Sequence, residues 1–172
     1  MKVFGVDPGS RVTGFGVIES SGSRLTCLDY GKIEGLQRGS PSDFAQRLVR
    51  IYQGLKERIA EHQPEVVAVE KVFHAVNVQT ALKLGHARGV ILLAAAEAGV
   101  PILEYSPLEI KKSVVGYGRA EKTQVQMMVK TLLNLRRTPQ PHDAADALAV
   151  AICHSFNGAP RRRSRQRWKA PR

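Results

Sequence analysis

The 172-residue chain has few of the residues on which small extracellular or membrane proteins depend. Its only two cysteines, Cys27 and Cys153, lie in separate apolar stretches without metal-ligand spacing, which excludes a disulfide framework and a cysteine zinc site and favours a reducing compartment. The best apolar run, Val90–Ala98, is about half as long as a bilayer span. The N-terminus lacks the charged flank, apolar stretch and cleavage site of a signal peptide. We therefore expect a soluble cytoplasmic protein.

Acidic residues are also scarce, since 15 Asp and Glu stand against 26 Lys and Arg, which gives a net charge of +11. Part of the excess lies in Arg161–Lys169, a stretch without apolar period that we expect to be disordered. The rest of the chain is basic even without it, so nucleic acid is favoured over an acidic protein or a membrane surface as partner. The length fits one folded domain, predicted over residues 1–157, followed by a disordered basic tail over 158–172.

The order of apolar patterns predicts an α/β fold, a mixed five-stranded sheet flanked by helices. The first three strands are expected to be antiparallel, and the fourth is expected to run parallel to the first after a helical crossover. The first helix has a start signature in which Ser40 caps, Pro41 takes the first helical position and Asp43 follows in the first turn. The predicted strands are Lys2–Asp7, Thr13–Glu19, Arg24–Ile33, Val66–Glu70 and Ile102–Tyr105, and the later helices are Val78–Ala98, Pro107–Val115, Arg119–Leu135 and Pro141–Cys153.

Two of these strands end in a carboxylate. Asp7 closes the first strand and enters Pro8–Gly9, and Glu70 closes its expected parallel neighbour. Taken separately, each acid has an ordinary interpretation: Asp7 would be a turn-forming aspartate, and Glu70 a solvated glutamate at the end of a strand. Parallel strands bring their carboxyl ends to the same edge of a sheet, which is where open α/β sheets place their sites. The two acids are therefore expected to lie close together.

Two more acids begin the last helix, which is otherwise almost wholly apolar. Asp143 and Asp146 are three residues apart and lie on one face of that helix. One acid in the first turn is explained by the helix dipole, but burying two unpaired carboxylates is costly unless a cation joins them. Four carboxylates with only oxygen ligands suit Mg²⁺ or Mn²⁺, and two such ions about 4 Å apart can promote attack of water on a phosphodiester. With a basic surface, this combination predicts a metal-dependent nuclease.

Other features fit a protein that holds DNA. Phe73 follows Glu70 in a loop with Lys71 and His74, where an exposed aromatic could stack on an unpaired base. Four cationic residues crowd a glycine-containing break: Lys111, Lys122 and the neighbouring Lys112 and Arg119. They form either a solvated face or a phosphate-binding edge. The long helix has a line of small residues and an apolar second half, which favours a two-fold dimer.

Four segments together closely resemble the RuvC family of Holliday-junction resolvases: Asp7–Gly9, Val69–Phe73, Ala81–Gly85 and Asp143–Ala149. The resemblance covers roughly residues 1–156, nearly all of the chain except the basic tail. It implies a ribonuclease H-like fold, a homodimer and symmetric cleavage of two strands of like polarity at a four-way DNA junction. It further implies 5′-phosphate and 3′-hydroxyl ends and cooperation with a branch-migration motor of the RuvA and RuvB type.

The resemblance assigns Asp7, Glu70, Asp143 and Asp146 as catalytic residues and ligands of two Mg²⁺ ions per active site, with Mn²⁺ as an alternative. Some family members have a histidine in place of the third acid. Here Asp143 occupies that place and His142 precedes it, so either residue could touch the metal, and Asp143 is favoured.

The family pattern also assigns three DNA-binding residues. Phe73 corresponds to the aromatic that unstacks bases at the crossover, while Lys111 and Lys122 match lysines near the scissile phosphate. A lysine there can hold the phosphate or offset charge that grows on it, which makes Lys122 a catalytic candidate as well. The arginine-rich tail is outside the shared pattern, and we expect it to add sequence-independent DNA affinity.

Two other functions stay open. Asp7–Ser10 followed by Thr13–Gly16 resembles the phosphate loop of the actin and sugar-kinase type, which would make the chain a nucleotide phosphotransferase, although those enzymes need two lobes. The chain could also be a non-catalytic module that recognises junction shape. Four acids facing phosphates argue against such a module, because without a metal they would weaken binding.

Overall fold

The chain folds around one sheet in the computed structural model, which describes residues 1–35, 43–71 and 77–158. The elements are β1 (Lys2–Asp7), β2 (Val12–Ser21), β3 (Arg24–Glu34), α1 (Phe44–His62), β4 (Val66–Glu70), α2 (Val78–Glu97), β5 (Ile102–Tyr105), α3 (Pro107–Val115), α4 (Lys122–Leu132) and α5 (His142–Asn157).

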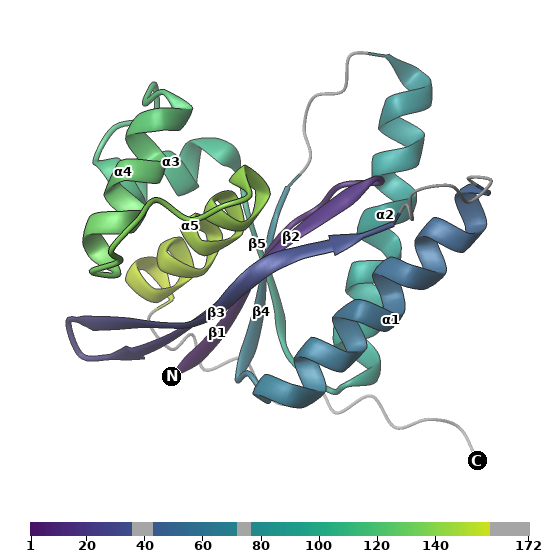
Figure 1. Ribbon diagram of the computed structural model, residues 1–172, viewed down its shortest axis with the longest axis horizontal. Coiled ribbons are helices and arrows are strands. Elements are labelled where there is room, and N and C mark those ends of the chain that lie inside the picture. Colours follow the sequence, from purple (N-terminus) through teal and green to yellow (C-terminus); the bar gives the residue numbers. More distant parts are fainter. Residues whose placement is uncertain (36–42, 72–76, 159–172) are drawn as a thin grey trace.

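The strand order is β3-β2-β1-β4-β5, with β1, β2 and β3 antiparallel in turn and β1, β4 and β5 parallel. Helices α1 and α2 cover one face of the sheet, and α3, α4 and α5 lie on the other (Figure 1). Each face has its own hydrophobic core. The predicted mixed five-stranded sheet, with its helical crossover from the third strand to the fourth, is confirmed.

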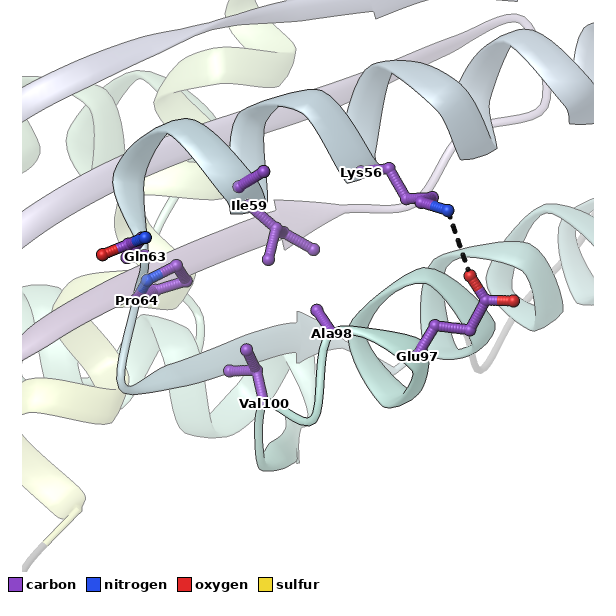
Figure 2. Close-up of a pocket in the computed structure, with 8 residues that line it drawn as sticks. Lys56, Ile59, Gln63, Pro64, Glu97, Ala98 and Val100 are labelled. Carbon is purple, nitrogen blue, oxygen red and sulfur yellow. Dashed lines mark ion pairs between the residues drawn. The ribbon is translucent and has the colours of Figure 1, made fainter. Parts of the chain in front are cut away.

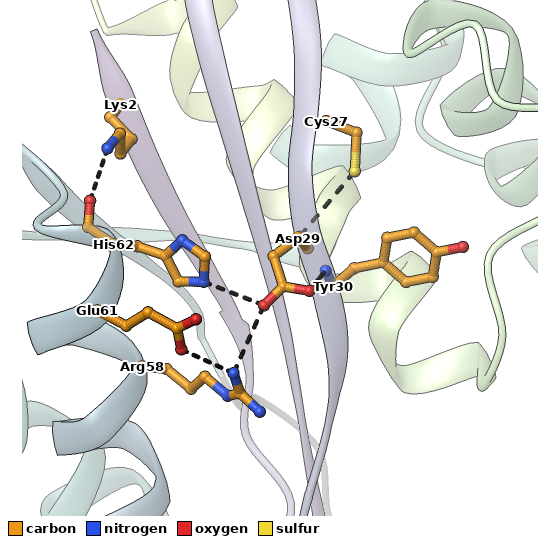
Figure 3. Close-up of polar contacts among 7 residues, drawn as sticks. All are labelled: Lys2, Cys27, Asp29, Tyr30, Arg58, Glu61 and His62. Carbon is orange, nitrogen blue, oxygen red and sulfur yellow. Dashed lines mark hydrogen bonds and ion pairs between the residues drawn. The ribbon is translucent and has the colours of Figure 1, made fainter.

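Strand β3 contributes to both faces because its pairing with β2 shifts at Val17 and Ile18. Before the shift, Cys27 packs on the α5 side. After it, the Asp29 carboxylate reaches α1 on the other side, where its Oδ2 lies 3.0 Å from His62 Nε2 and 3.9 Å from Arg58 Nη1 (Figure 3). A bulge re-aims side chains in this way. The result is a polar link between the edge strand and the end of α1.

Two helix boundaries differ from the sequence prediction. Helix α1 begins at Phe44, and its cap is Asp43, whose carboxylate accepts a hydrogen bond from Ala45 N. The predicted cap at Ser40 was therefore wrong, and Ser40 itself lies outside the described residues. The helix predicted over 119–135 spans only Lys122–Leu132. Gln124 Oε1 accepts a hydrogen bond from Glu121 N, which fixes the start of the helix there.

The last helix continues to Asn157, four residues beyond its predicted end. Phe73 and the predicted tail after residue 158 lie outside the described residues. Within the described ranges, no helix is long and apolar enough to cross a membrane.

Candidate active site

The alternation of side chains along two parallel strands directs Asp7 and Glu70 to the same face of the sheet. In β1, Val3 belongs to the core beneath α5 and Phe4 to the opposite core. Successive strand residues point to opposite faces, so Asp7 points to the side of Val3. In β4, Ala68 belongs to the same core as Val3, and Glu70 lies two residues further on. Both acids therefore end their strands on the α5 side.

Helix α5 approaches this edge closely because β1 and β2 carry glycines beneath it. A Cβ on Gly14 would lie 2.0 Å from the backbone oxygen of Asp143, and one on Gly5 would lie 2.1 Å from that of Ala147. Gly14 is also the β2 partner of Asp7. The first turn of α5 therefore rests directly beside the end of β1, which brings Asp143 and Asp146 toward Asp7.

The pKa of Asp7 is affected by the neighbouring acids. Burial raises the pKa of Asp7 to about 8, with further contributions from the charges of Glu70, Asp146 and Asp143. Burial also raises the pKa of Glu70, together with the charge of Asp146, although a hydrogen bond with Asp7 and two lysines oppose the rise. Such mutual repulsion arises only where carboxylates share a site. The charges of Glu70, Asp146 and Asp143 thus act on Asp7, as the predicted convergence of the four acids requires.

A cavity of about 370 Å³ opens at this edge of the sheet. Its lining includes Asp7, Glu70 and Asp146 together with the predicted lysines, Lys111 and Lys122. The carboxylates and ammonium groups in this lining give the cavity both metal-ligand oxygens and phosphate-binding cations.

Lys122 makes direct contact with one of the acids. Its Nζ lies 2.6 Å from Asp146 Oδ2. Burial lowers the pKa of Lys122, but the hydrogen bond and the charge of Asp146 outweigh burial and raise the pKa. Lys122 is therefore a cation at neutral pH and does not act as a general base.

Asp143 and His142 have different surroundings. Asp143 does not line the cavity, but its charge is one of those that raise the pKa of Asp7. His142 is exposed, and its Nδ1 lies 2.8 Å from Nε2 of Gln126, a buried residue of α4. This contact ties the start of α5 to α4. Nothing in the sequence pointed to Gln126 as a support of the site, since a polar residue in an amphipathic helix reads as solvent-facing.

The donor set fits a hard divalent cation, because it consists of carboxylate oxygens whose negative charges repel one another. Among the described residues, however, no group of three or more His, Cys, Asp or Glu side chains stands close enough to hold a metal ion.

A larger cavity, of about 510 Å³, lies between the C-terminal ends of α1 and α2 (Figure 2). Its carboxylate, Glu97, already pairs with Lys56 at 3.4 Å and with the Tyr52 hydroxyl. The rest of the lining shown in Figure 2 is mainly apolar and includes Ile59 and Val100. This cavity offers no set of free acids, so the chemistry points to the smaller one.

Comparison with known proteins supports one family. The family model described as crossover junction endodeoxyribonuclease RuvC matches residues 3–154. A crossover junction endodeoxyribonuclease RuvC from Alkaliphilus oremlandii is 51% identical and the alignment covers 92% of this chain and 94% of the relative. The protein of that name from Geobacter metallireducens is 54% identical, over 90% of this chain and 92% of the relative.

Solved structures agree with the sequence match. Thermus thermophilus RuvC in complex with a Holliday junction substrate superimposes with a TM-score of 0.84 at 36% identity, over 92% of this chain and 94% of that chain. The yeast mitochondrial Holliday junction resolvase Ydc2 shares the fold with a TM-score of 0.64 at 16% identity, over 90% of this chain and 77% of that chain. The ribonuclease H-like fold implied by the sequence resemblance is thereby confirmed.

Proposed function

Because the chain belongs to the RuvC family of crossover junction endodeoxyribonucleases, we propose that it resolves Holliday junctions by metal-dependent hydrolysis of two strands of like polarity. The observation that carries this proposal is the cavity in which Asp7, Glu70 and Asp146 face Lys111 and Lys122. Acids supply ligands for a metal and lysines supply partners for phosphate, so one cavity contains what phosphodiester hydrolysis needs.

Two Mg²⁺ ions, or Mn²⁺ as an alternative, would bind in each site. The residues that would hold them are Asp7, Glu70, Asp143 and Asp146. When bound, these ions supply an activated water and charge stabilisation for the leaving oxygen. Attack of water on phosphorus with departure of the 3′ oxygen gives a 5′-phosphate and a 3′-hydroxyl.

The protein's own groups bind and orient the phosphate. Lys122 keeps its proton because of Asp146, so its ammonium can donate hydrogen bonds to a phosphate oxygen as charge develops there. Lys111 faces the same cavity from α3 and offers a second cation. We assign Phe73, which lies outside the described residues, to base unstacking at the crossover on the basis of the family pattern alone.

We propose a homodimer formed through α2. The outer face of this helix exposes apolar side chains, with Val78 75% exposed and Leu82 58% exposed. Gly85 and Gly89 have open space where a Cβ would stand, so another backbone could approach closely. Two-fold symmetry would present two identical sites to the two cleaved strands. A branch-migration motor of the RuvA and RuvB type and a cytoplasmic location follow from the family and stay predictions.

The kinase-like alternative has less support, because the described residues form one sheet with one carboxylate site and the chain spans nearly the whole length of its resolvase relatives. A non-catalytic module is disfavoured by the retained acids. Neither alternative is supported by a specific contact in the structure.

Cleavage of a synthetic four-way junction with a mobile core, in Mg²⁺ and in Mn²⁺, tests the proposal. We expect symmetric nicks that a ligase can seal, lost in Asp7→Asn and Glu70→Gln while junction binding is retained. Glu19→Gln, an exposed acid on β2 that does not line the cavity, is the matched control and should cut normally. Binding without cutting in either metal would favour the non-catalytic module instead.

A further inference from the structure

Three arginines surround Gly35, the residue that follows β3. Gly35 N donates a hydrogen bond to Arg11 O at 2.9 Å, and Arg50 Nη1 donates one to Gly35 O at 3.4 Å. A Cβ on Gly35 would lie 3.3 Å from Arg47 Cβ. We call Arg11, Arg47 and Arg50 the Gly35 arginine cluster.

The cluster lies at the same edge of the sheet as the acids. Arg11 stands in the turn between Asp7, which ends β1, and Val12, which begins β2. Arg47 and Arg50 belong to the first two turns of α1, which covers the face opposite to α5 (Figure 1). Cations therefore flank the acidic edge on both faces, with Lys111 and Lys122 on one and the cluster on the other.

The cluster carries charge that the described residues do not neutralise. Arg47 Nε is buried and has no hydrogen-bond partner among the residues that the structure describes. Among the described residues, no carboxylate forms an ion pair with any of the three arginines. A guanidinium is always charged, and a buried donor without an acceptor is costly. An anion that accepts a hydrogen bond from this group would remove that cost.

The acids near the cluster are already engaged. The Asp43 carboxylate accepts a hydrogen bond from Ala45 N at the start of α1, and Glu34 pairs with Lys32 at 2.5 Å. The first turn of α1 contains no acid, so the positive end of its dipole adds to the three arginines. The local field therefore favours an anion from another molecule.

We propose that the Gly35 arginine cluster binds backbone phosphates of a junction arm beyond the cleavage site and so positions the scissile strand over Asp7 and Glu70. This inference rests on the proposed function. Arginine forks match phosphate oxygens, and contacts to phosphate fix the register of DNA without reading sequence. A duplex that crosses the acidic edge meets cations on both sides, so its phosphates can be held on either side of the reacting bond. The three arginines are positioning residues.

Junction affinity as a function of salt tests the cluster. Fluorescence anisotropy of a labelled four-way junction is measured without divalent metal for the full chain and for Arg11→Gln, Arg47→Gln and Arg50→Gln. Each lost phosphate contact should lower the slope of log affinity against log salt by about 0.9 and weaken binding by about tenfold. Arg47→Lys should keep the slope but lose affinity, because lysine retains the charge without the fork.

The matched control is Arg24→Gln, which removes the same charge from the exposed first residue of β3, at the other end of the strands. It should leave the slope unchanged and the affinity within twofold. Cluster variants that behave like Arg24→Gln would overturn the proposal. If Arg47→Gln fails to fold, the result for Arg11→Gln and Arg50→Gln decides, since the Arg11 side chain is exposed and the Arg50 side chain is only partly buried.

The unsubstituted chain separates this proposal from the proposed function. If it neither binds nor cuts the junction, the resolvase function fails and the cluster proposal fails with it. If it binds and cuts, and the cluster variants keep its slope, only the cluster proposal is overturned. A reduced slope with slower cutting at saturating protein supports the positioning role.

Discussion

Replacing Gly14 with alanine should separate positioning of the acids from stability of the fold. A Cβ at residue 14 would lie 2.0 Å from Asp143 O and 2.4 Å from Asp143 C. Real Cβ atoms essentially never come within 3.0 Å of another heavy atom, and both obstructing atoms are backbone. The first turn of α5 must therefore withdraw by about 1 Å, and Asp143 and Asp146 withdraw with it.

The two consequences of this withdrawal differ in size. Overpacking of this kind costs about 1–3 kcal/mol, which lowers the Tm by roughly 2–12 °C in a domain of this length. A displacement of about 1 Å in a catalytic constellation can cost about 100-fold in rate. We therefore expect Gly14→Ala to fold at 25 °C and to cut a four-way junction about 100-fold more slowly than the unsubstituted chain.

Single-turnover cleavage at saturating protein, together with a thermal melt, measures both effects. Gly54→Ala is the matched control, because its Cβ would lie 2.7 Å from Ile33 Cγ2 on the opposite face of the sheet. A side chain can rotate away, so this variant should lose some stability and keep its cleavage rate within threefold. If Gly14→Ala also keeps its rate within threefold while its Tm falls, contact between α5 and β2 does not position the acids.

Three further results are expected. Lys122→Met should slow cleavage by about 10²–10³-fold with less than a tenfold loss of junction affinity. Lys130→Met, at the far end of α4, should change neither the cleavage rate nor the affinity. Equal effects of the two substitutions would contradict a role of Lys122 in the site. Burial lowers the pKa of His154, so its contribution to stability is present above the unfolded pKa of about 6.5 and is lost as the pH falls below it. His154→Gln, whose side-chain amide can still form a hydrogen bond with the Tyr105 hydroxyl, should therefore lose less stability than the unsubstituted chain between pH 7.5 and 5.5, and identical melts would contradict this. Truncation after Pro160 should weaken junction binding and lower its salt slope, and an unchanged slope would reject a role for the basic tail.

The strand edge could be predicted from the sequence because its signals are local and additive. The apolar run before Glu70 is β-branched and short, and chain direction alone requires a parallel neighbour of β1 to end where Asp7 does. Helix ends were less predictable, because several caps of similar energy stand side by side. Asp43 and Ser40 both fit a cap in the sequence, and in the structure the Asp43 carboxylate accepts the hydrogen bond from Ala45 N and α1 begins at Phe44.

Contacts between distant residues could not be predicted, because no pattern in the sequence reports them. Asp29 meets His62 only because the pairing of β2 with β3 slips by one residue, and that slip leaves no signature in composition. Arg11 and Arg47 are 36 positions apart and become neighbours through Gly35, a loop glycine that by itself marks only the end of a strand.

The glycines of the first two strands show how such distant contacts fix the site. In the sequence, Gly5 and Gly14 stand within two predicted strands, and nothing there says what approaches them. In the structure, the line of α5 that contains Asp143, Ala147 and Ala151 passes over Gly14 and then Gly5. These residues are spaced by four, so one stripe of the helix meets both glycines with its backbone and Cβ atoms. Rotation or sliding of α5 would disrupt this close fit, so the contacts of Ala147 and Ala151 with Gly5, one to two turns away, help to hold the acids of its first turn in register.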